Sequence, residues 1–202
     1  MVWQAQWIWR KGETTPRNAY LYARKTFELQ DAVRKALAHC VADSRYKLFV
    51  NKRFVGRGPV RSDPRWQRYD TYDLSKLLEP GINVVAMLVH HLGSGSSSYV
   101  LGRAGLLFQC DVVHTNGELT QVRSDRTWRV KRCTAWADDA PRIHPQAGFA
   151  EVYDARLGVD GWESPDLDDT DWEEPQVIGK PPKRPWLRLC PRDVPALKEE
   201  KP

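Results

Sequence analysis

The chain has 202 residues, which is long enough for one large domain with a buried core. Hydrophobic residues make up 41% and charged residues 28%, a composition typical of globular rather than disordered chains. The net charge of +5 is too small by itself to indicate a nucleic-acid partner, and no apolar run approaches the length that crosses a membrane.

Segments with alternating or β-branched apolar residues dominate the chain and are separated by turn residues. The predicted strands cover residues 20–29, 36–42, 46–50, 54–55, 69–74, 83–90, 105–113, 119–122 and 128–131. Residues 51–53 and 114–117 predict hairpin turns, because asparagine and glycine tolerate a positive φ. Helix is predicted nowhere except for a turn or two within 31–38. Many short strands joined by turns imply an all-β sandwich with little helix.

Loops are predicted at 56–64, 91–98 and 141–148, where glycine, proline and serine gather. Residues 162–172 are acidic and rich in turn residues. From Pro175 onward, frequent proline and lysine predict an extended stretch. We see no internal repeat.

The four cysteines are widely spaced and include no C-x-x-C pair, which argues against a zinc site. Cys40 and Cys110 fall in apolar runs, where a buried free thiol is expected. The N-terminus lacks the basic and apolar regions of a secretory signal peptide. We therefore expect a cytoplasmic chain with reduced thiols and no cofactor.

Residues 43–83 carry the most specific pattern in the chain. In order, they read Asp43-Ser44-Arg45-Tyr46, Leu48-x-Val50-Asn51, Val55-Gly56-x-Gly58-Pro59, Tyr69-Asp70-Thr71-Tyr72-Asp73 and Pro80-Gly81-x-Asn83. This ordered set resembles the N-terminal β-sandwich of bacterial α-L-rhamnosidases, a jelly-roll module of galactose-binding-like type. Trp7-Ile8-Trp9 and the segments 151–156 and 191–195 agree with the same order.

The resemblance implies a noncatalytic carbohydrate-recognition or scaffold module at 1–186, followed by an extended tail at 187–202 that leads to a helical catalytic domain. Its glycan partner would contain rhamnose or a related sugar. The alternative is a purely structural or interaction domain that docks on a catalytic domain without a sugar site. No catalytic residue is assigned, because the carboxylates at 166–171 share one turn and cannot flank a glycosidic bond from opposite sides.

The loop after the predicted strand 83–90 is the first candidate sugar site. Its polar residues His90, Ser94 and Tyr99 can exchange hydrogen bonds with hydroxyl groups. His90 and His91 are neighbours on a strand and point to opposite faces, so they are not expected to chelate a metal together. The alternative is a mobile connection with one core histidine.

Trp66, Tyr69 and Asp70 form the second candidate. An aromatic face stacks on the apolar face of a sugar ring, and a carboxylate accepts hydrogen bonds from hydroxyls. Alanine at Trp66 is therefore expected to weaken glycan binding. The alternative is an aromatic plug over the sandwich edge.

A domain interface is the role considered for a third group. Asp154 and Arg156 lie two positions apart, on one face of an expected strand, where they can form an ion pair or meet a partner. The group comprises Glu151, Tyr153, Asp154 and Arg156.

Two charged segments complete the candidates. The basic residues within 52–68 match no nucleic-acid module and are interpreted as a solvated face. The acidic residues at 166–171 offer calcium ligands without EF-hand spacing, and we predict no metal there.

Overall fold

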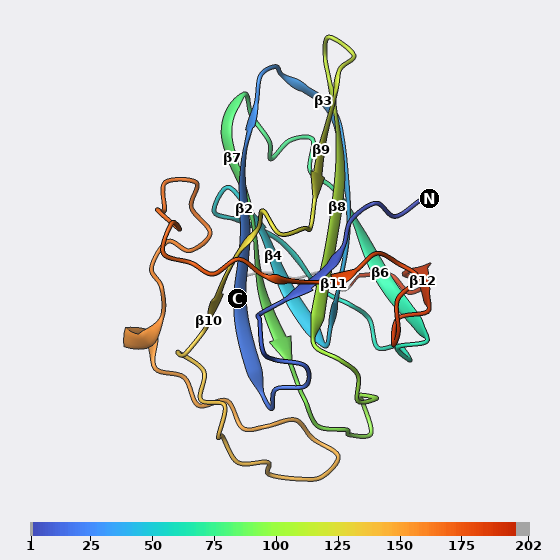
Figure 1. Cartoon of the computed structure of the whole chain (residues 1–202), viewed down its shortest axis with the longest axis vertical. Helices are drawn as coiled ribbons and strands as arrows, with labels where there is room; N and C mark the ends of the chain where they lie inside the picture. The colour runs from blue at the N-terminus through green and yellow to red at the C-terminus, as the bar shows by residue number, and fades with distance from the viewer. Residues whose placement is uncertain (1, 197–202) are drawn as a thin grey trace.

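In the computed structural model, which describes residues 2–196, the chain consists almost entirely of β-strands (Figure 1). The strands are β1 (Trp7–Trp9), β2 (Ala19–Leu29), β3 (Val33–Asp43), β4 (Arg45–Val50), β5 (Arg53–Gly58), β6 (Trp66–Asp73), β7 (Gly81–His91), β8 (Gly105–His114), β9 (Leu119–Arg123), β10 (Arg129–Arg132), β11 (Gln176–Gly179) and β12 (Arg188–Pro191). One short 3-10 helix, η1 (Ala155–Leu157), lies in the long connection before β11. No helix in the described residues is long and apolar enough to cross a membrane.

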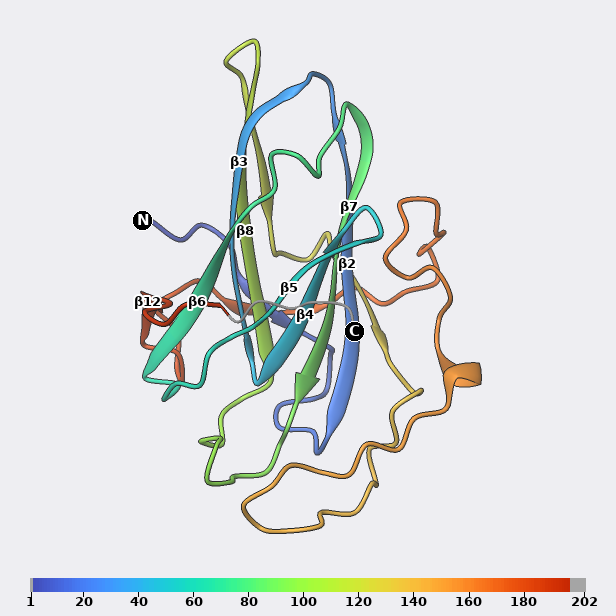
Figure 2. The same ribbon diagram turned by 180° about the vertical axis from the view of Figure 1, so that it is seen from behind.

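The strands form two sheets that pack face to face (Figures 1 and 2). The five-stranded sheet has the order β10-β2-β7-β4-β5. The seven-stranded sheet has the order β11-β1-β8-β3-β6-β12, with β9 also paired to β8. β12 runs parallel to β6, whereas the other strand pairs are antiparallel. The predicted all-β sandwich is confirmed.

Alternation along each strand determines which side chains reach the core. In β7, Val85, Met87 and Val89 are buried in the core between the sheets, whereas Leu88 and His90 point to the opposite face. The largest fully buried side chains in this core are four tryptophans: Trp7, Trp9, Trp128 and Trp186. Several of the nine tryptophans therefore serve packing rather than ligand binding.

The helical turn considered at 31–38 is wrong, because Val33–Asp43 is one continuous strand. Ala36, Ala38 and Cys40 lie on its buried side, and β3 pairs with β8 along most of its length. The alternation of buried and open positions therefore prevails over the helix propensity of alanine. Cys40 and Cys110 are buried free cysteines, as predicted.

Asn51 and Lys52 adopt positive φ angles of 48° and 69°, which confirms the predicted hairpin turn between β4 and β5. β5 extends through Gly58, so the loop predicted from Gly56 begins later than expected. A Cβ atom at Gly56 would lie only 2.6 Å from the Tyr72 ring, which explains the glycine inside a strand.

The C-terminal stretch is more ordered than its proline content suggests. Residues 176–179 pair with β1, and residues 188–191 pair with β6. The expected boundary after residue 186 stays a prediction, and the end of the expected tail, residues 197–202, lies outside the described residues.

Candidate functional site

A groove of about 910 Å³ lies over the outer face of the five-stranded sheet. Its floor follows from strand register. Tyr20 of β2 lies opposite His90 of β7, which in turn lies opposite Arg45 of β4. In the next row on the same face, Leu88 lies opposite Lys47. Two adjacent rows therefore place aromatic, apolar and cationic side chains side by side.

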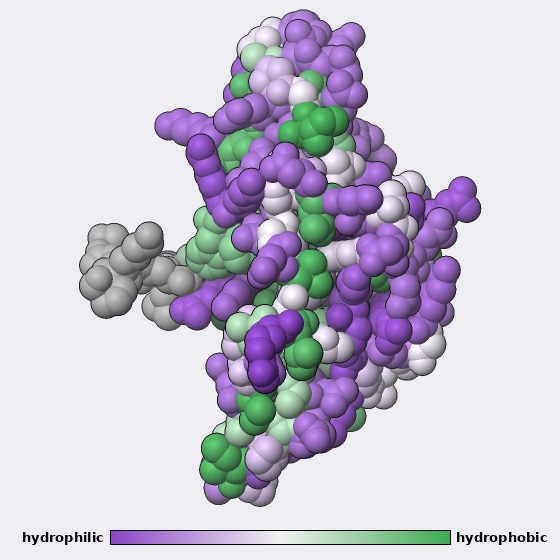
Figure 3. Space-filling model, turned by 90° about the vertical axis from the view of Figure 1, so that its left-hand side faces the viewer, coloured by the Kyte–Doolittle hydropathy of each residue, from purple (hydrophilic) through white to green (hydrophobic). Residues whose placement is uncertain are grey.

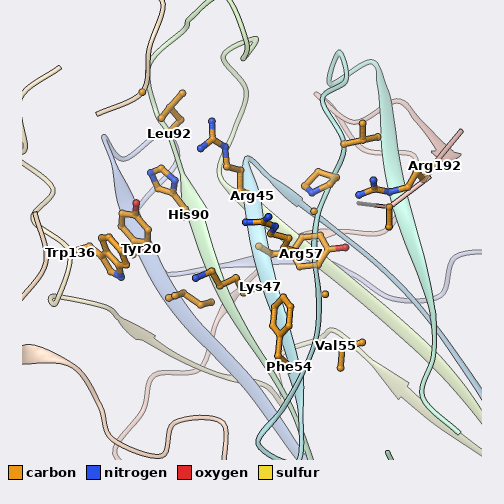
Figure 4. A pocket seen from close by; sticks show the side chains of 18 of the residues that line it. Tyr20, Arg45, Lys47, Phe54, Val55, Arg57, His90, Leu92, Trp136 and Arg192 are labelled. Carbon is orange, nitrogen blue, oxygen red and sulfur yellow. The ribbon is translucent and has the colours of Figure 1, made fainter. Parts of the chain in front are cut away.

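The groove has two walls. Trp136, Phe149 and Glu151 line one side, and the segment from Phe54 to Val60 lines the other. Figure 4 shows Tyr20, His90 and Trp136 gathered at one side, Arg45, Lys47 and Arg57 in the middle, and Arg192 beyond them.

Hydrogen bonds attach the first wall to the body of the sandwich. The Asn18 amide donates to the Ala137 carbonyl at 2.9 Å, and the Arg17 guanidinium donates to the Ala140 carbonyl at 2.7 Å. The same guanidinium lies 4.2 Å from the centre of the Phe149 ring. A wall held by these contacts gives a groove that is formed before any ligand arrives.

The aromatic residues of the groove stack mainly on one another. The His90 and Tyr20 rings are parallel with centroids 4.1 Å apart, and Tyr20 stacks on Trp136 at 4.9 Å. Trp136 also contacts the tilted ring of Tyr153, with centroids 4.6 Å apart. Tyr20 is therefore stacked between two rings, and Trp136 contacts Tyr20 and Tyr153, so these side chains are engaged mainly with one another, whereas Phe54 on the other wall is 45% exposed.

Positive charge predominates among the groove residues. Arg45, Lys47, Arg57 and Arg192 line it together with a single carboxylate among the described residues, Glu151. Arg192 donates to the buried carboxylate of Asp70 and is already paired. Arg45 and Lys47 are exposed and form no ion pair within the described part of the chain.

Burial lowers the pKa of His90 to about 3, with a further lowering by the positive charge of Arg45. His90 is therefore neutral at neutral pH, and its Nε2 lies 2.9 Å from the Asn18 amide oxygen. The groove owes its positive charge to arginine and lysine and not to histidine.

The lowered pKa of His90 predicts a pH dependence of stability. The unfolded chain takes up this proton below about pH 6.5, whereas the folded chain resists it down to about pH 3. The stabilisation is complete above the unfolded pKa and is lost as the pH falls through this window. Urea unfolding should show a smaller difference between pH 7 and pH 4.5 for His90→Gln than for the original chain. Equal differences, or an imidazole signal that titrates near pH 6.5 in NMR, would contradict this.

The structure separates the residues of the second predicted site. Trp66 is 51% exposed at the start of β6, with the Arg188 guanidinium 4.2 Å from its ring centre. Tyr69 packs edge-on against Trp3 at 5.2 Å. Asp70 is buried, and its carboxylate accepts hydrogen bonds from other side chains of the protein. The sugar contact at Trp66 stays a prediction, and Asp70 is not placed to share it.

The first predicted site is also divided. His90 lies in the groove, whereas Ser94 accepts a hydrogen bond from Arg142 at 2.9 Å and Tyr99 donates to the buried Asp43. His91 is buried with its Nδ1 3.0 Å from the Asp43 carbonyl oxygen, which confirms that the adjacent histidines face opposite sides.

Of the third group, Glu151 lines the groove and Tyr153 supports Trp136 from outside. The expected ion pair is confirmed, since Asp154 and Arg156 lie 2.6 Å apart. They are not on a strand: Asp154 accepts the backbone N–H of Arg156 and caps η1. Their role at a domain interface stays a prediction.

The acidic segment 166–171 binds cations of the protein itself. Asp166 pairs with Lys52 at 3.1 Å and Asp171 with Lys131 at 2.9 Å. Across residues 2–196, no group of three or more histidine, cysteine or acidic side chains is arranged to hold a metal ion.

The sequence reasoning missed most of the groove. Tyr20 and Lys47 lie within predicted strands, whereas Arg45 precedes the predicted strand 46–50 and is the first residue of β4. No local signal marks Trp136, which reaches the groove from a separate loop.

The family described as the alpha-L-rhamnosidase N-terminal domain matches residues 31–200, most of the chain. The chain belongs to this family. An alpha-L-rhamnosidase of Streptomyces avermitilis is 29% identical over 69% of the chain, and one of Formosa agariphila is 25% identical over 87%. The chain spans only 14% and 20% of the lengths of these two relatives.

Solved structures give the same result. A GH78 family rhamnosidase of Bacillus sp. GL1 is 40% identical and superposes with a TM-score of 0.89, over 96% of this chain and 20% of that one. A lectin from Pleurotus ostreatus shares the fold at 24% identity, with a TM-score of 0.64 over 90% of this chain and 43% of the lectin. This alpha-L-rhamnosidase N-terminal domain thus has a sandwich fold that also occurs in a lectin.

Proposed function

We propose that this domain is the noncatalytic glycan-recognition module of an α-L-rhamnosidase-like glycoside hydrolase. The observation that carries the proposal is the preformed groove over β2, β7 and β4. Its volume is within the range of ligand sites, and its lining combines hydrogen-bond donors with a carboxylate. The ligand would be a glycan that contains rhamnose or a related sugar. In this proposal catalysis belongs to a helical domain further along the whole protein.

The fold is compatible with this role. The Pleurotus ostreatus lectin with the same fold has been solved in complex with GalNAc. Figure 3 shows one side of the domain as largely hydrophilic, with hydrophobic residues scattered among polar ones. Such a surface favours polar recognition over broad apolar docking.

A second candidate function is docking on a catalytic domain without sugar binding. It is favoured by three exposed apolar side chains that follow the groove wall in sequence: Val152, Tyr153 and Leu157. Exposed apolar groups in one segment are typical of an interface. The two functions are separated by whether the isolated domain binds a glycan.

Filling the groove is expected to weaken glycan binding. Gly148 lines the groove, and a Cβ atom there would meet only Leu92 at 3.9 Å. The first atom of a larger side chain therefore fits without a steric clash. We expect Gly148→Trp to weaken binding of a rhamnose-containing oligosaccharide by about tenfold or more, as measured by calorimetric titration. Gly95→Trp is the matched control, because Gly95 lies outside the groove with no atom within 4 Å of a built Cβ.

Three outcomes of this titration are decisive. Loss of binding in Gly148→Trp alone supports the groove. Loss in Trp66→Ala with none in Gly148→Trp would move the site to β6 and contradict the groove. No binding by the original domain to a panel of rhamnosides would favour the docking function instead.

A further inference from the structure

We infer that the groove selects acidic glycans, with Arg45 and Lys47 binding a carboxylate or sulfate group on a sugar. This inference rests on the proposed function and specifies the ligand class for the same site. It follows from which side chains of the groove have no partner within the described residues and can bind a ligand.

The central aromatic side chains of the groove contact one another. Flat sugar faces are commonly recognised by stacking on an aromatic ring. Here Tyr20 stacks on His90 and Trp136, and Trp136 also contacts Tyr153, so these rings are engaged with one another. The central aromatic residues therefore stiffen the groove, Phe54 on the far wall is 45% exposed, and Arg45 and Lys47 supply the charged groups of the floor.

Two cationic side chains, Arg45 and Lys47, lie side by side on the groove floor. Arg45 and Lys47 are two positions apart on β4, so both project from the outer face of the sheet, about 7 Å apart along the strand. That separation is comparable to the length of one sugar residue. An arginine guanidinium binds a carboxylate or sulfate through two parallel hydrogen bonds, and a lysine ammonium adds a point charge beside it.

No acidic side chain in the described residues neutralises these two cations. Arg45 and Lys47 form none of the ion pairs found in residues 2–196. Arg192 is paired with Asp70. Glu151, on the opposite wall, is placed to accept hydrogen bonds from sugar hydroxyls. The groove thus offers two unpaired cations on its floor and one acceptor on its rim, a pattern that fits an anionic sugar bordered by neutral ones.

The test compares two forms of one ligand. A rhamnose-containing oligosaccharide with uronate residues is titrated beside the same oligosaccharide after its carboxyl groups have been reduced to alcohols. We expect the acidic form to bind about tenfold more tightly, because hydrogen bonds to charged groups exceed neutral ones. Arg45→Gln with Lys47→Gln should remove this preference, so that the variant binds the acidic and the reduced form with equal affinity. The control, Arg34→Gln with Lys35→Gln, alters two exposed cations of β3 outside the groove.

The outcomes separate this inference from the proposed function. Equal affinity for the two forms overturns acidic selectivity while glycan recognition stands. Binding of neither form overturns the proposed function. If an acidic peptide of equal charge binds as tightly as the uronate oligosaccharide, the groove recognises charge alone, and the glycan selectivity is overturned. If the variant with Arg45→Gln and Lys47→Gln still prefers the acidic form, other residues bind the anionic group, and the role inferred for Arg45 and Lys47 is overturned.

Discussion

Replacing Trp186 with alanine is expected to lower the free energy of unfolding by about 4 kcal/mol, the range for deleting a large buried aromatic side chain. Trp186 is fully buried and stacks on Trp7 with ring centroids 3.7 Å apart. Its indole N–H donates to the carboxylate of Asp43 at 3.3 Å. A Cβ atom at Gly105 would lie 2.5 Å from the Trp186 ring, so the ring fills the space tightly. Alanine leaves a large cavity and a buried carboxylate with one donor fewer.

Trp66→Ala is the matched control for this measurement. It removes the same side chain from a half-exposed site whose main contact is the Arg188 guanidinium, so its cost should be about 1 kcal/mol. Urea unfolding of both variants gives the comparison, with an unchanged m-value showing that stability alone has changed. Similar losses in the two variants would mean that the C-terminal segment contributes little to the core.

Trp186 begins a C-terminal segment that is attached to both sheets. Immediately after Trp186, β12 adds to the edge of the seven-stranded sheet, and Arg192 reaches the buried Asp70. Asp70 also accepts a hydrogen bond from Tyr46 in the opposite sheet. Residues 186–192 are therefore fixed to the sandwich by burial, strand pairing and an ion pair.

The sandwich was predictable because its strands carry a local signal. In β4, Tyr46, Leu48 and Val50 alternate with exposed Arg45 and Lys47, and this period of two is visible without any tertiary information. The C-terminal strands were not predictable in the same way. Arg188–Pro191 has no clear alternation, and it pairs with β6 two residues after Trp186, which is fully buried in the core.

The groove was less predictable than the fold, for a physical reason. Alternation reveals that a strand has two faces, but not whether a distant loop covers the outer one. On the outer face of β2, Trp136 packs beside Tyr20. Further along the same face, residues 164–169 cover Arg24. Trp66 and Asp70 are close in sequence, yet one is exposed and the other is buried. Residue type alone therefore suggested a site that the fold does not assemble.

Arg24→Met is expected to destabilise the domain by about 3 kcal/mol, because it removes one partner of a buried ion pair. Arg24 is fully buried on the outer face of β2, and burial lowers its pKa while the charge of Asp169 acts in the opposite direction. Its guanidinium lies 3.2 Å from the Asp169 carboxylate and donates to the carbonyl of Ser164 at 2.9 Å and to that of Leu167 at 3.3 Å. Methionine keeps most of the volume and supplies none of these donors.

Lys131→Met is the matched control, because it shows how much stability is lost when a different, exposed cation that pairs with the acidic segment is removed. Lys131 pairs with Asp171 of the same segment, but both side chains are well exposed, so the expected loss is about 0.5 kcal/mol or less. Amide hydrogen exchange adds a local measurement: residues 161–172 should lose protection in Arg24→Met and keep it in Lys131→Met. Equal effects of the two substitutions would mean that exposed charge, rather than buried Arg24, holds the segment on the sheet. The difference is expected because the contacts of Arg24 with Ser164, Leu167 and Asp169 are buried, whereas the pair of Lys131 and Asp171 is exposed.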